Sequence, residues 1–306
     1  MRALVVGANG FAGRYMCREL ENNGYSVTRA DVSSGNGIVH LDIMDQAAIE
    51  EMIDREKPEV IFNLAGFASV SRSFADPQMT ISLNVIGSIN ILEAVRAKDP
   101  DIRVVLIGSS DQYGNAAADD LPVTEASRQN PMSPYAISKR CQEDIGVAYS
   151  KLYGMNVFMT HSFNHIGVGQ RTGFVVTDFA KGIADIEKGL STTLRVGNTN
   201  SYRSFTDVRD TVRAYRLIAE RGKPGSVYNV GSEKQYSIKY ILDTLIGFST
   251  VDIAVEVDKD KIRPFDTPCV RCDSTLLSQD TGWQPMYSVE QTLKEILDSF
   301  RGDGNA

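Results

Sequence analysis

Residues 1–22 of this chain of 306 read MRALVVGANGFAGRYMCRELEN. Its apolar run at residues 3–6 predicts a buried strand, and the spacing after residue 13 predicts a helix. Between the two stand Gly7, Gly10 and Gly13 in a GxxGxxG pattern. Glycines allow a tight turn and let the backbone approach a pyrophosphate, which the amino terminus of a helix attracts. The stretch therefore predicts the opening unit of a dinucleotide-binding domain.

An acidic residue follows the second predicted strand. Asp31 lies 18 residues after the last of these glycines, where a carboxylate can accept hydrogen bonds from an adenosine ribose. The same charge would repel a 2′-phosphate, which favours NAD(H) as the cofactor. Arg29 keeps NADP(H) possible, because a guanidinium can pair with that phosphate. Further along, Asp42 can accept a hydrogen bond from an adenine amino group, or else Asp42 or Asp45 caps a helix.

Short β-rich runs alternate with longer helical segments through the first half of the chain. The expected strands are residues 3–6, 26–30, 60–64, 104–107 and 157–160, and the expected helices are residues 13–22, 46–56, 77–97 and 134–152. Such alternation predicts an α/β fold built on a doubly wound parallel sheet. Ligands of such sheets bind beyond the carboxyl ends of the strands. Residues 7–13, 63–73 and 108–114 should therefore line one crevice.

The regular alternation ends near residue 165, after which glycines and prolines gather in loops. Because residues 226–230 again resemble a strand, the carboxyl-terminal part is expected to return partly to the sheet. We therefore expect a dinucleotide-binding domain made of residues 1–165 with parts of 200–232. Residues 166–200 and 233–306 are expected to form a smaller, discontinuous α/β lobe that binds the substrate.

Composition and charge exclude several classes of protein. Hydrophobic residues make up 42% of the chain and charged residues 23%, which disfavours disordered, collagen-like and coiled-coil proteins. The formal net charge of −7 argues against a surface for nucleic acids or anionic membranes. No apolar stretch approaches the ~18 residues of a membrane span. The amino terminus lacks a signal-peptide pattern and four cysteines do not make a disulfide framework, so a cytoplasmic location is expected.

Cysteines near the carboxyl-terminal end form the one pattern that suggests a metal. Cys269 and Cys272 make a CxxC, but a structural zinc site needs two further ligands. The three histidines of the chain, His40, His161 and His165, lie far upstream. No metal site is therefore predicted.

A tyrosine and a lysine one helical turn apart carry the predicted chemistry. Tyr135 and Lys139 form YxxxK within SPYAISK, so their side chains project from one face of the helix. An ammonium near a phenol favours the phenolate and lowers its pKa, which makes Tyr135 a candidate general acid or base. Ser109 follows the strand at residues 104–107 and supplies a hydroxyl to the same crevice.

The motifs GANGFAG, NLAG, SSDQYG and YAISK resemble those of the extended short-chain dehydrogenase/reductase family, over essentially the whole chain. The resemblance implies a Rossmann-type domain, a smaller lobe that binds a nucleotide sugar, and a catalytic triad of Ser109, Tyr135 and Lys139. It also implies that Lys139 bonds the nicotinamide ribose and that Asn84 lies behind it, unless Asn84 is only a polar helix residue. The expected cofactor contacts are Gly7, Asn9, Gly10, Phe11, Ala12, Gly13, Asp31, Asp42, Ile43, Leu64, Ala65, Gly66, Asn84, Tyr135 and Lys139.

Within that family, HSFNHIGVGQRTGFVVTDFAKGIA at residues 161–184 resembles the region that shapes the substrate cleft of the GDP-sugar branch. The pattern FNHxGPGQ, followed by GFV and DFA, is typical there of enzymes that reduce GDP-4-dehydro-6-deoxy-D-mannose to GDP-D-rhamnose. The matching residues are Asn164, His165, Phe174 and Val175. Ser162 and Val168 replace prolines of this pattern, and His161 replaces its arginine.

The same resemblance implies arginines that bind the diphosphate of the substrate. Arg203 in YRSFTDVRD and Arg263 in IRPFDTP match such family positions. A guanidinium suits this role because it presents paired donors to phosphate oxygens. Arg209 fits phosphate contact and an ion pair with Asp207 or Asp210 equally well.

The choice between two reactions depends on Asp111 in SSDQYG. In GDP-mannose 4,6-dehydratases the residue two positions before the tyrosine is a glutamate that removes a proton from the sugar, and Asp111 is one methylene shorter. We therefore expect a reductase, with a GDP-mannose 4,6-dehydratase or another nucleotide-sugar 4-epimerase or reductase as the alternative. A non-enzymatic, dinucleotide-sensing regulator is disfavoured because Tyr135 and Lys139 are both present.

The expected partners are a GDP-sugar substrate and a second copy of the chain. Relatives in the family commonly pair flanking helices into a four-helix dimer interface, which here would use residues 77–97 and 134–152. Both helices would bury apolar faces in a monomer as well. No nucleic-acid or membrane partner is expected.

Overall fold

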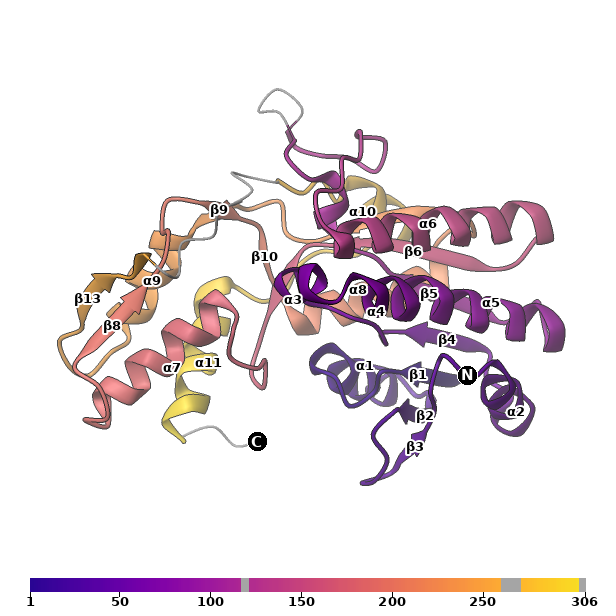
Figure 1. Cartoon of the computed structure of the whole chain (residues 1–306), viewed down its shortest axis with the longest axis horizontal. Coiled ribbons are helices and arrows are strands. Elements are labelled where there is room, and N and C mark those ends of the chain that lie inside the picture. The colour runs from indigo at the N-terminus through magenta and orange to yellow at the C-terminus, as the bar shows by residue number, and fades with distance from the viewer. Residues whose placement is uncertain (117–120, 260–270, 303–306) are drawn as a thin grey trace.

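Seven parallel strands form the central sheet of the larger lobe (Figure 1). The computed structural model describes residues 1–116, 121–259 and 271–302. From one edge to the other, the strands are β11 (Val227–Val230), β6 (Val157–Ser162), β5 (Arg103–Ile107), β4 (Val60–Asn63), β1 (Arg2–Val6), β2 (Ser26–Asp31) and β3 (Ile38–His40). The predicted doubly wound parallel sheet is therefore confirmed. Its order changes direction between β1 and β4, which is where such sheets bind their ligands.

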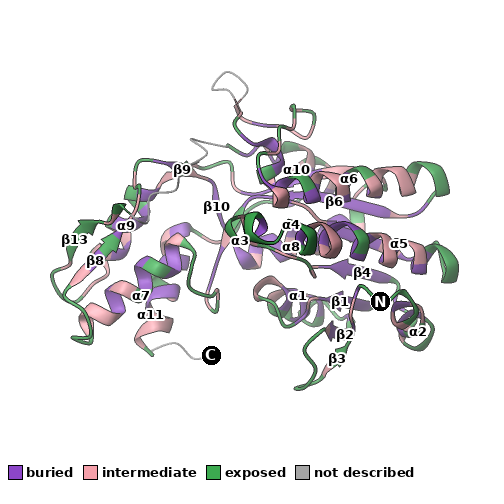
Figure 2. Cartoon of the chain, in the orientation of Figure 1, coloured by how far each residue is buried: buried purple, intermediate pink, exposed green. Residues whose placement is uncertain are grey.

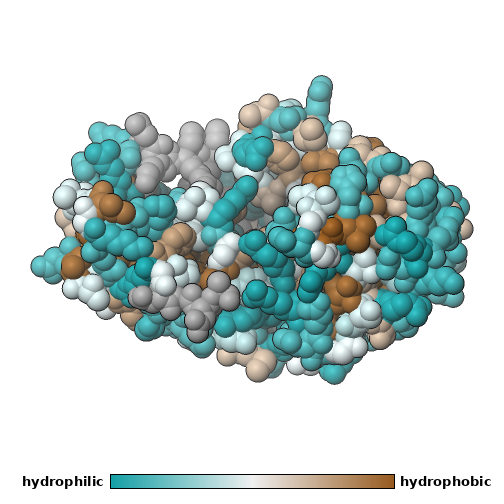
Figure 3. All heavy atoms as spheres, turned by 90° about the horizontal axis from the view of Figure 1, so that it is seen from below, coloured by the Kyte–Doolittle hydropathy of each residue, from teal (hydrophilic) through white to brown (hydrophobic). Residues whose placement is uncertain are grey.

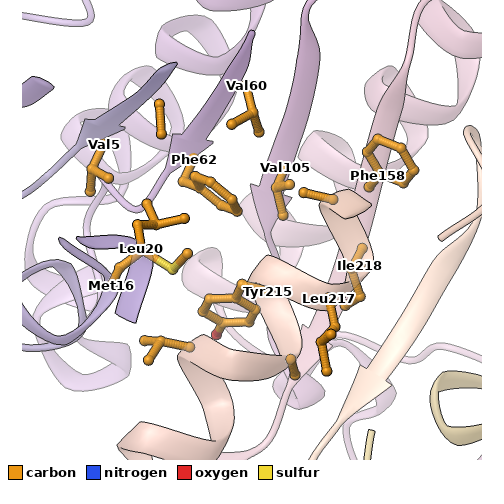
Figure 4. Close-up of a cluster of buried hydrophobic side chains, with 14 of the residues drawn as sticks. Val5, Met16, Leu20, Val60, Phe62, Val105, Phe158, Tyr215, Leu217 and Ile218 are labelled. Atoms are coloured by element: carbon orange, nitrogen blue, oxygen red, sulfur yellow. The ribbon is translucent and has the colours of Figure 1, made fainter. Parts of the chain in front are cut away.

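Helices cover both faces of this sheet, because successive residues of a strand point to opposite sides. One face carries α1 (Phe11–Asn22), α8 (Val208–Arg221) and α10 (Thr275–Thr281), and the other carries α2 (Gln46–Glu56), α5 (Gly87–Lys98) and α6 (Pro134–Tyr153). On the first face, Phe62 and Phe158 of the sheet pack with Leu20 of α1 and with Tyr215 and Ile218 of α8 (Figure 4). This packing holds the start of α1 against the end of β1.

The helix predicted at residues 77–97 is interrupted by a change of helix type. A short helix, α3 (Val70–Ala75), precedes α4 (Pro77–Ile81), which leads into a π-helix, η1 (Ser82–Ile86), and then into α5. The prediction of one regular helix is therefore wrong over residues 82–86. π turns are rare and occur often at functional sites. Here the turn carries the buried Asn84.

Among the described residues, the helices of the smaller lobe are α7 (Val175–Glu187), α9 (Ile238–Gly247) and α11 (Val289–Arg301). Its core includes Ile183 of α7, Leu245 of α9 and Leu293 of α11. Short strand pairs complete it: β8 (Thr193–Val196) with β13 (Ala254–Val257), β7 (Asn164–Ile166) with β10 (Phe205–Asp207), and β9 (Tyr202–Arg203) with β12 (Tyr236–Ser237). β10 runs between the two lobes in Figure 1, so the chain enters α8 directly from the smaller lobe.

One carboxyl-terminal segment departs from the expected division into lobes. Residues 233–306 were all expected in the smaller lobe, but α10 packs against α8 and β11 of the larger lobe. Leu277 and Trp283 are fully buried in the core beneath the sheet, and the Trp283 indole N–H donates to the carbonyl oxygen of Asp210 at 2.9 Å. Burial of two large apolar side chains outweighs proximity in sequence to α9 and α11.

The surface of the molecule is mostly polar. Buried residues concentrate in the sheet and on the inner sides of the helices (Figure 2), and the face seen from below is largely hydrophilic with separate apolar patches (Figure 3). Across residues 1–116, 121–259 and 271–302, no helix combines the length and apolar character that a membrane span needs. Within those same ranges, no group of three or more His, Cys, Asp or Glu residues is arranged to hold a metal ion.

Candidate active site

The turn between β1 and α1 requires glycine at two positions. Gly7 has a φ of +84°, and a Cβ there would lie 2.6 Å from the backbone nitrogen of Ala65. A Cβ on Gly13 would lie 2.1 Å from the carbonyl oxygen of Gly7. Neither contact is possible for a larger residue, so the first turn of α1 packs directly on the loop that leaves β1. The GxxGxxG pattern thereby brings the start of α1 next to the loop after β4.

The amino terminus of α1 is open to an anion. The helix begins at Phe11 after Gly10, and in the described part of the chain no side chain caps it. The backbone N–H groups of the first turn therefore lack intrahelical acceptors and can bind a phosphate. Asn9 and Gly10 are exposed, whereas Ala12 packs on the core. The Phe11 ring stacks on His165 of β7, with ring centroids 6.0 Å apart.

Asp31 is held at the end of β2 by the same turn. One of its carboxylate oxygens accepts from the backbone N–H of Asn9 at 3.1 Å. The other accepts from the backbone N–H and the hydroxyl of Ser33, at 3.0 and 2.9 Å. Arg29 points elsewhere, because its guanidinium pairs with Glu21 at 2.6 Å. The carboxylate of Asp31 is thus the charged group that flanks the exposed end of this turn.

The two acidic residues after β3 both accept hydrogen bonds from backbone N–H groups. Asp42 accepts from the N–H of Met44 at 2.9 Å, and Asp45 caps α2 by accepting from Ala48 at 3.1 Å. Ile43 between them is buried, and its side chain packs on Gly87 of α5. A contact from Ile43 to an adenine would therefore use its backbone.

A buried asparagine shapes the loop after β4. The side chain of Asn84 accepts from the N–H of Phe67 at 2.8 Å and donates to the carbonyl oxygen of Phe67 at 3.2 Å. It also donates to the Ser138 hydroxyl at 2.8 Å, next to Lys139. A Cβ on Gly66 would lie 2.5 Å from the Asn84 side-chain oxygen, so this loop fits against η1 only with glycine. Asn84 therefore links the loop of Leu64, Ala65 and Gly66 to α6.

Ser109 and Tyr135 meet at the carboxyl end of β5. Ser109 caps a 3₁₀ helix, η2 (Ser110–Tyr113), and its hydroxyl accepts from the N–H of Asp111 at 3.2 Å. Burial raises the pKa of the Tyr135 phenol, the nearby Asp111 carboxylate raises it further, and the Ser109 hydrogen bond opposes both. The phenol therefore stays protonated at neutral pH, which corrects the prediction that Lys139 lowers this pKa.

Lys139 is turned toward the backbone of β5. Its ammonium donates to the carbonyl oxygen of Ile107 at 2.7 Å and to the side-chain oxygen of Gln142 at 3.0 Å. Burial lowers the pKa of Lys139 to about 8. The structure thus brings Ser109, Tyr135 and Lys139 to one end of the sheet, although the ammonium is committed to acceptors other than the phenol.

The predicted substrate residues lie on the smaller lobe and on the strands that lead to it. Asn164 of β7 is exposed, and Phe174 is exposed immediately before Val175 begins α7. The Arg171 guanidinium lies over the Phe174 ring at 5.8 Å, a contact that sequence reasoning missed. Arg203 donates to the carbonyl oxygen of Tyr202 at 2.7 Å. Arg263 and Cys269 lie outside the described residues.

Arg209 is committed to an ion-pair network. Its guanidinium bonds both oxygens of Asp207, at 2.9 and 2.6 Å, and Glu295 at 2.7 Å. It also lies over the Tyr287 ring, 3.8 Å from the centroid. Of the two alternatives, the structure favours the ion pair, because the donors of Arg209 are directed at carboxylates.

Sequence reasoning also missed two buried glutamines. Gln142 bonds Lys139, and Gln112 bonds the backbone of Ser109, yet both are almost fully buried. A polar residue three positions after a predicted catalytic lysine, on the buried side of α6, was the available signal for Gln142. This signal could not be used from the sequence alone, because the sequence did not show which face of α6 is buried.

Comparison with known proteins places the chain in a family. A family model described as GDP-mannose 4,6 dehydratase matches residues 4–296. GDP-6-deoxy-D-mannose reductase of Pseudomonas aeruginosa is 30% identical over 98% of this chain and 97% of its own length. GDP-mannose 4,6 dehydratase 1 of Arabidopsis thaliana is 28% identical over 97% of this chain and 88% of its own. A solved structure of RMD from Pseudomonas aeruginosa complexed with NADPH has a TM-score of 0.87 at 29% identity, covering 98% of this chain and 99% of that one.

These likenesses extend over the sheet, the crevice and the smaller lobe together. The family model covers nearly the whole chain, and both relatives align along more than four fifths of their own lengths. The resemblance to extended short-chain dehydrogenases/reductases that the motifs indicated is confirmed. The chain belongs to the GDP-mannose 4,6-dehydratase family of nucleotide-sugar enzymes.

Proposed function

We propose that this enzyme reduces the 4-keto group of GDP-4-dehydro-6-deoxy-D-mannose to give GDP-D-rhamnose, with NAD(P)H as the hydride donor. The observation that carries the proposal is that Ser109 and Tyr135 meet at the carboxyl end of β5, next to an aspartate at position 111 that is one methylene shorter than a glutamate. A reduction needs a proton donor at the carbonyl oxygen, whereas an initial oxidation needs a base there. The relative named GDP-6-deoxy-D-mannose reductase supports the same choice.

Each member of the triad has a distinct role in this proposal. A bound NAD(P)H would supply the hydride that carbon four of the sugar receives. Ser109 and Tyr135 donate hydrogen bonds to the keto oxygen, and Tyr135 then transfers its proton to the alkoxide. Lys139 is cationic below its pKa of about 8 and stabilises the phenolate that this transfer leaves.

We propose that the cofactor lies across the end of the sheet at β1 and β4. The open first turn of α1 at Gly10 would hold its pyrophosphate, and Asp31 would accept from the adenosine ribose. The carboxylate at Asp31, with Arg29 paired to Glu21, favours NAD(H). The related RMD structure carries NADPH, so NADP(H) is the second candidate. Asp42, Ile43, Leu64, Ala65, Gly66 and Asn84 would line the same path.

We propose that the GDP-sugar lies between the two lobes. Asn164, Phe174 and Val175 would contact it from β7 and the start of α7, and Arg203 and Arg263 would meet its diphosphate. This assigns the sheet, with α8 and α10, to the cofactor and the lobe of α7, α9 and α11 to the substrate. Cys17, Cys141 and Cys272 are free thiols, which is compatible with a reaction in the reducing cytoplasm.

The assay that tests this function supplies each substrate separately and follows the absorbance of the reduced cofactor. With GDP-4-dehydro-6-deoxy-D-mannose, we expect NADH or NADPH to be consumed in proportion to the sugar reduced. With GDP-mannose we expect no keto sugar to form. Formation of a keto sugar from GDP-mannose without net use of cofactor would instead assign the dehydratase, for which Asp111 stands at the position of the base.

We propose that two copies pair through the helices that flank the sheet. Met79 of α4, Ile86 of η1 and Ile137 of α6 are exposed apolar side chains on elements that pack together, and a shallow pocket lined by Pro77, Gln78, Ile81 and Ser82 opens beside them. Apolar side chains gathered in this way are typical of interfaces.

Ile137→Glu should convert the dimer into a monomer, because it would place two unpaired charges in an apolar interface. Multi-angle light scattering would measure the mass. Leu190→Glu is the matched control, since Leu190 is equally apolar and more exposed but lies on the smaller lobe. A variant at Ile137 that keeps the wild-type mass would exclude this face.

A further inference from the structure

A buried polar cluster lies directly behind Ser109. It consists of Gln112, Gln129, Glu143 and His161, which come from η2, the loop before α6, α6 itself and β6. Gln112 and His161 are 0% exposed and Glu143 is 9% exposed, whereas Gln129 is half-buried. Groups so deeply buried are costly unless their hydrogen bonds are made, so their contacts are informative about what they hold.

Gln112 connects the cluster to the backbone of Ser109. Its side-chain oxygen accepts from the Ser109 N–H at 3.0 Å. Its side-chain nitrogen donates to Gln129 at 3.1 Å and to the Glu143 carboxylate at 2.5 Å. A flipped amide would set N–H against N–H at Ser109 and oxygen against carboxylate at Glu143, so only one orientation is stable. The amide of Gln112 is thus held as an acceptor for Ser109.

The other members of the cluster keep Glu143 an ionised acceptor. Its second oxygen accepts from Gln129 at 2.9 Å, and His161 bonds the oxygen that Gln112 also uses. Burial raises the pKa of Glu143, but the hydrogen bonds from His161, Gln129 and Gln112 outweigh burial and the pKa is lowered. His161 is held in turn by the Tyr113 hydroxyl, 2.7 Å from its Nδ1. The series of hydrogen bonds that starts at Ser109 therefore ends at His161, a buried residue of β6.

The geometry of Ser109 follows from these contacts. Its N–H donates to Gln112 and its hydroxyl oxygen accepts from the Asp111 N–H, so both the backbone and the side chain of Ser109 are held in place next to Tyr135. We propose that Gln112 is a positioning residue, which sets Ser109 for hydrogen bonding to Tyr135 and the keto oxygen; this rests on the proposed reduction. Gln112 acts through Ser109 and does not itself touch substrate.

Loss of Gln112 should weaken turnover more than binding. Gln112→Leu keeps a similar volume but removes the acceptor for Ser109, and a displacement near 1 Å can cost about 100-fold in rate. We expect kcat to fall about 10- to 100-fold with little change in the KM of the keto sugar. Gln112→Asn, whose amide is one methylene too short to reach both ends, should give the same pattern in case the leucine variant does not fold.

A double-mutant cycle separates positioning from simple loss of stability. If Gln112 acts through Ser109, Gln112→Leu should lower kcat in the wild type but have no further effect in a Ser109→Ala background. Tyr228→Phe is the matched control: it removes a buried hydroxyl that donates to Asp280 and accepts from the Lys223 N–H, outside the cluster, and leaves Gln112 bonded to Ser109. It should lower the melting temperature and leave kcat unchanged. Equal losses from Gln112→Leu in both backgrounds would overturn the proposal.

A measurement without substrate tests the contact itself. Amide hydrogen exchange at Ser109 should accelerate in Gln112→Leu, because the N–H loses its acceptor, and should stay at the wild-type rate in Tyr228→Phe. Unchanged exchange in Gln112→Leu would overturn the positioning role whatever the substrate. Failure of the wild type to reduce the keto sugar would instead count against the proposed function, and accelerated exchange would still support the contact.

Discussion

Tyr135→Phe is expected to lower kcat on the order of 100- to 10,000-fold while the cofactor binds almost as before. The phenol is the proton donor of the proposed reduction, and a positioned acid contributes a factor of this size. The turn at Gly7 and the loop after β4 are held by contacts of Ala65 and Asn84, which removal of one phenol oxygen leaves in place. Steady-state kinetics with the keto sugar would measure kcat, and fluorescence titration would measure the affinity for the reduced cofactor.

Tyr149→Phe is the control for that substitution. Tyr149 lies on the same helix, α6, and its hydroxyl donates to Glu93 at 2.5 Å, away from the crevice. It should keep wild-type kcat. Retention of more than a few per cent of activity in Tyr135→Phe would remove Tyr135 from the role of acid.

Lys139→Met is expected to have the second largest effect and to change the pH profile. Burial lowers the pKa of Lys139 to about 8, so in the wild type the ammonium is present below this pH and is lost as pH rises through it. The phenolate left by proton transfer is then no longer stabilised, and kcat/KM should decline above about pH 8. Methionine removes the charge at every pH, which should cost on the order of 100-fold or more in kcat/KM.

The shape of the profile identifies the group that titrates. In Lys139→Met the decline near pH 8 should disappear, whereas Lys139→Arg, whose guanidinium stays charged, should shift any decline to higher pH. Rates measured from pH 6 to 10 with the keto sugar would give both profiles. A decline near pH 8 that persists in Lys139→Met would assign it to a different group.

Local pattern was sufficient for much of the fold. The strands at β1, β4, β5 and β6 begin and end within two residues of the predicted ranges, because each is a short apolar run bounded by polar or glycine residues. The GxxGxxG turn was predictable because its steric demand is local: a Cβ on Gly13 would meet the Gly7 carbonyl six residues away. The motifs also sufficed to recognise the family that the comparisons confirm.

Local sequence pattern did not predict contacts between residues that lie far apart in the sequence. Residues 271–283 return to the sheet because Trp283 packs in the core beside α8. The local periodicity of the sequence does not predict this contact. Likewise, the ion pair of Arg29 with Glu21 and that of Arg209 with Asp207 and Glu295 depend on which side chains the fold brings within reach.

Spacing along one or two elements was enough to predict the parallel sheet and the glycine turn and to select Ser109, Tyr135 and Lys139 as candidates. Only the tertiary structure decided their chemical states and orientations. Tyr135 is kept protonated by burial and by Asp111, Lys139 is turned toward Ile107, and Ser109 is held by Gln112. Burial and hydrogen bonding arise only when the fold brings distant residues together. The cluster behind Ser109, for example, joins residues 112, 129, 143 and 161.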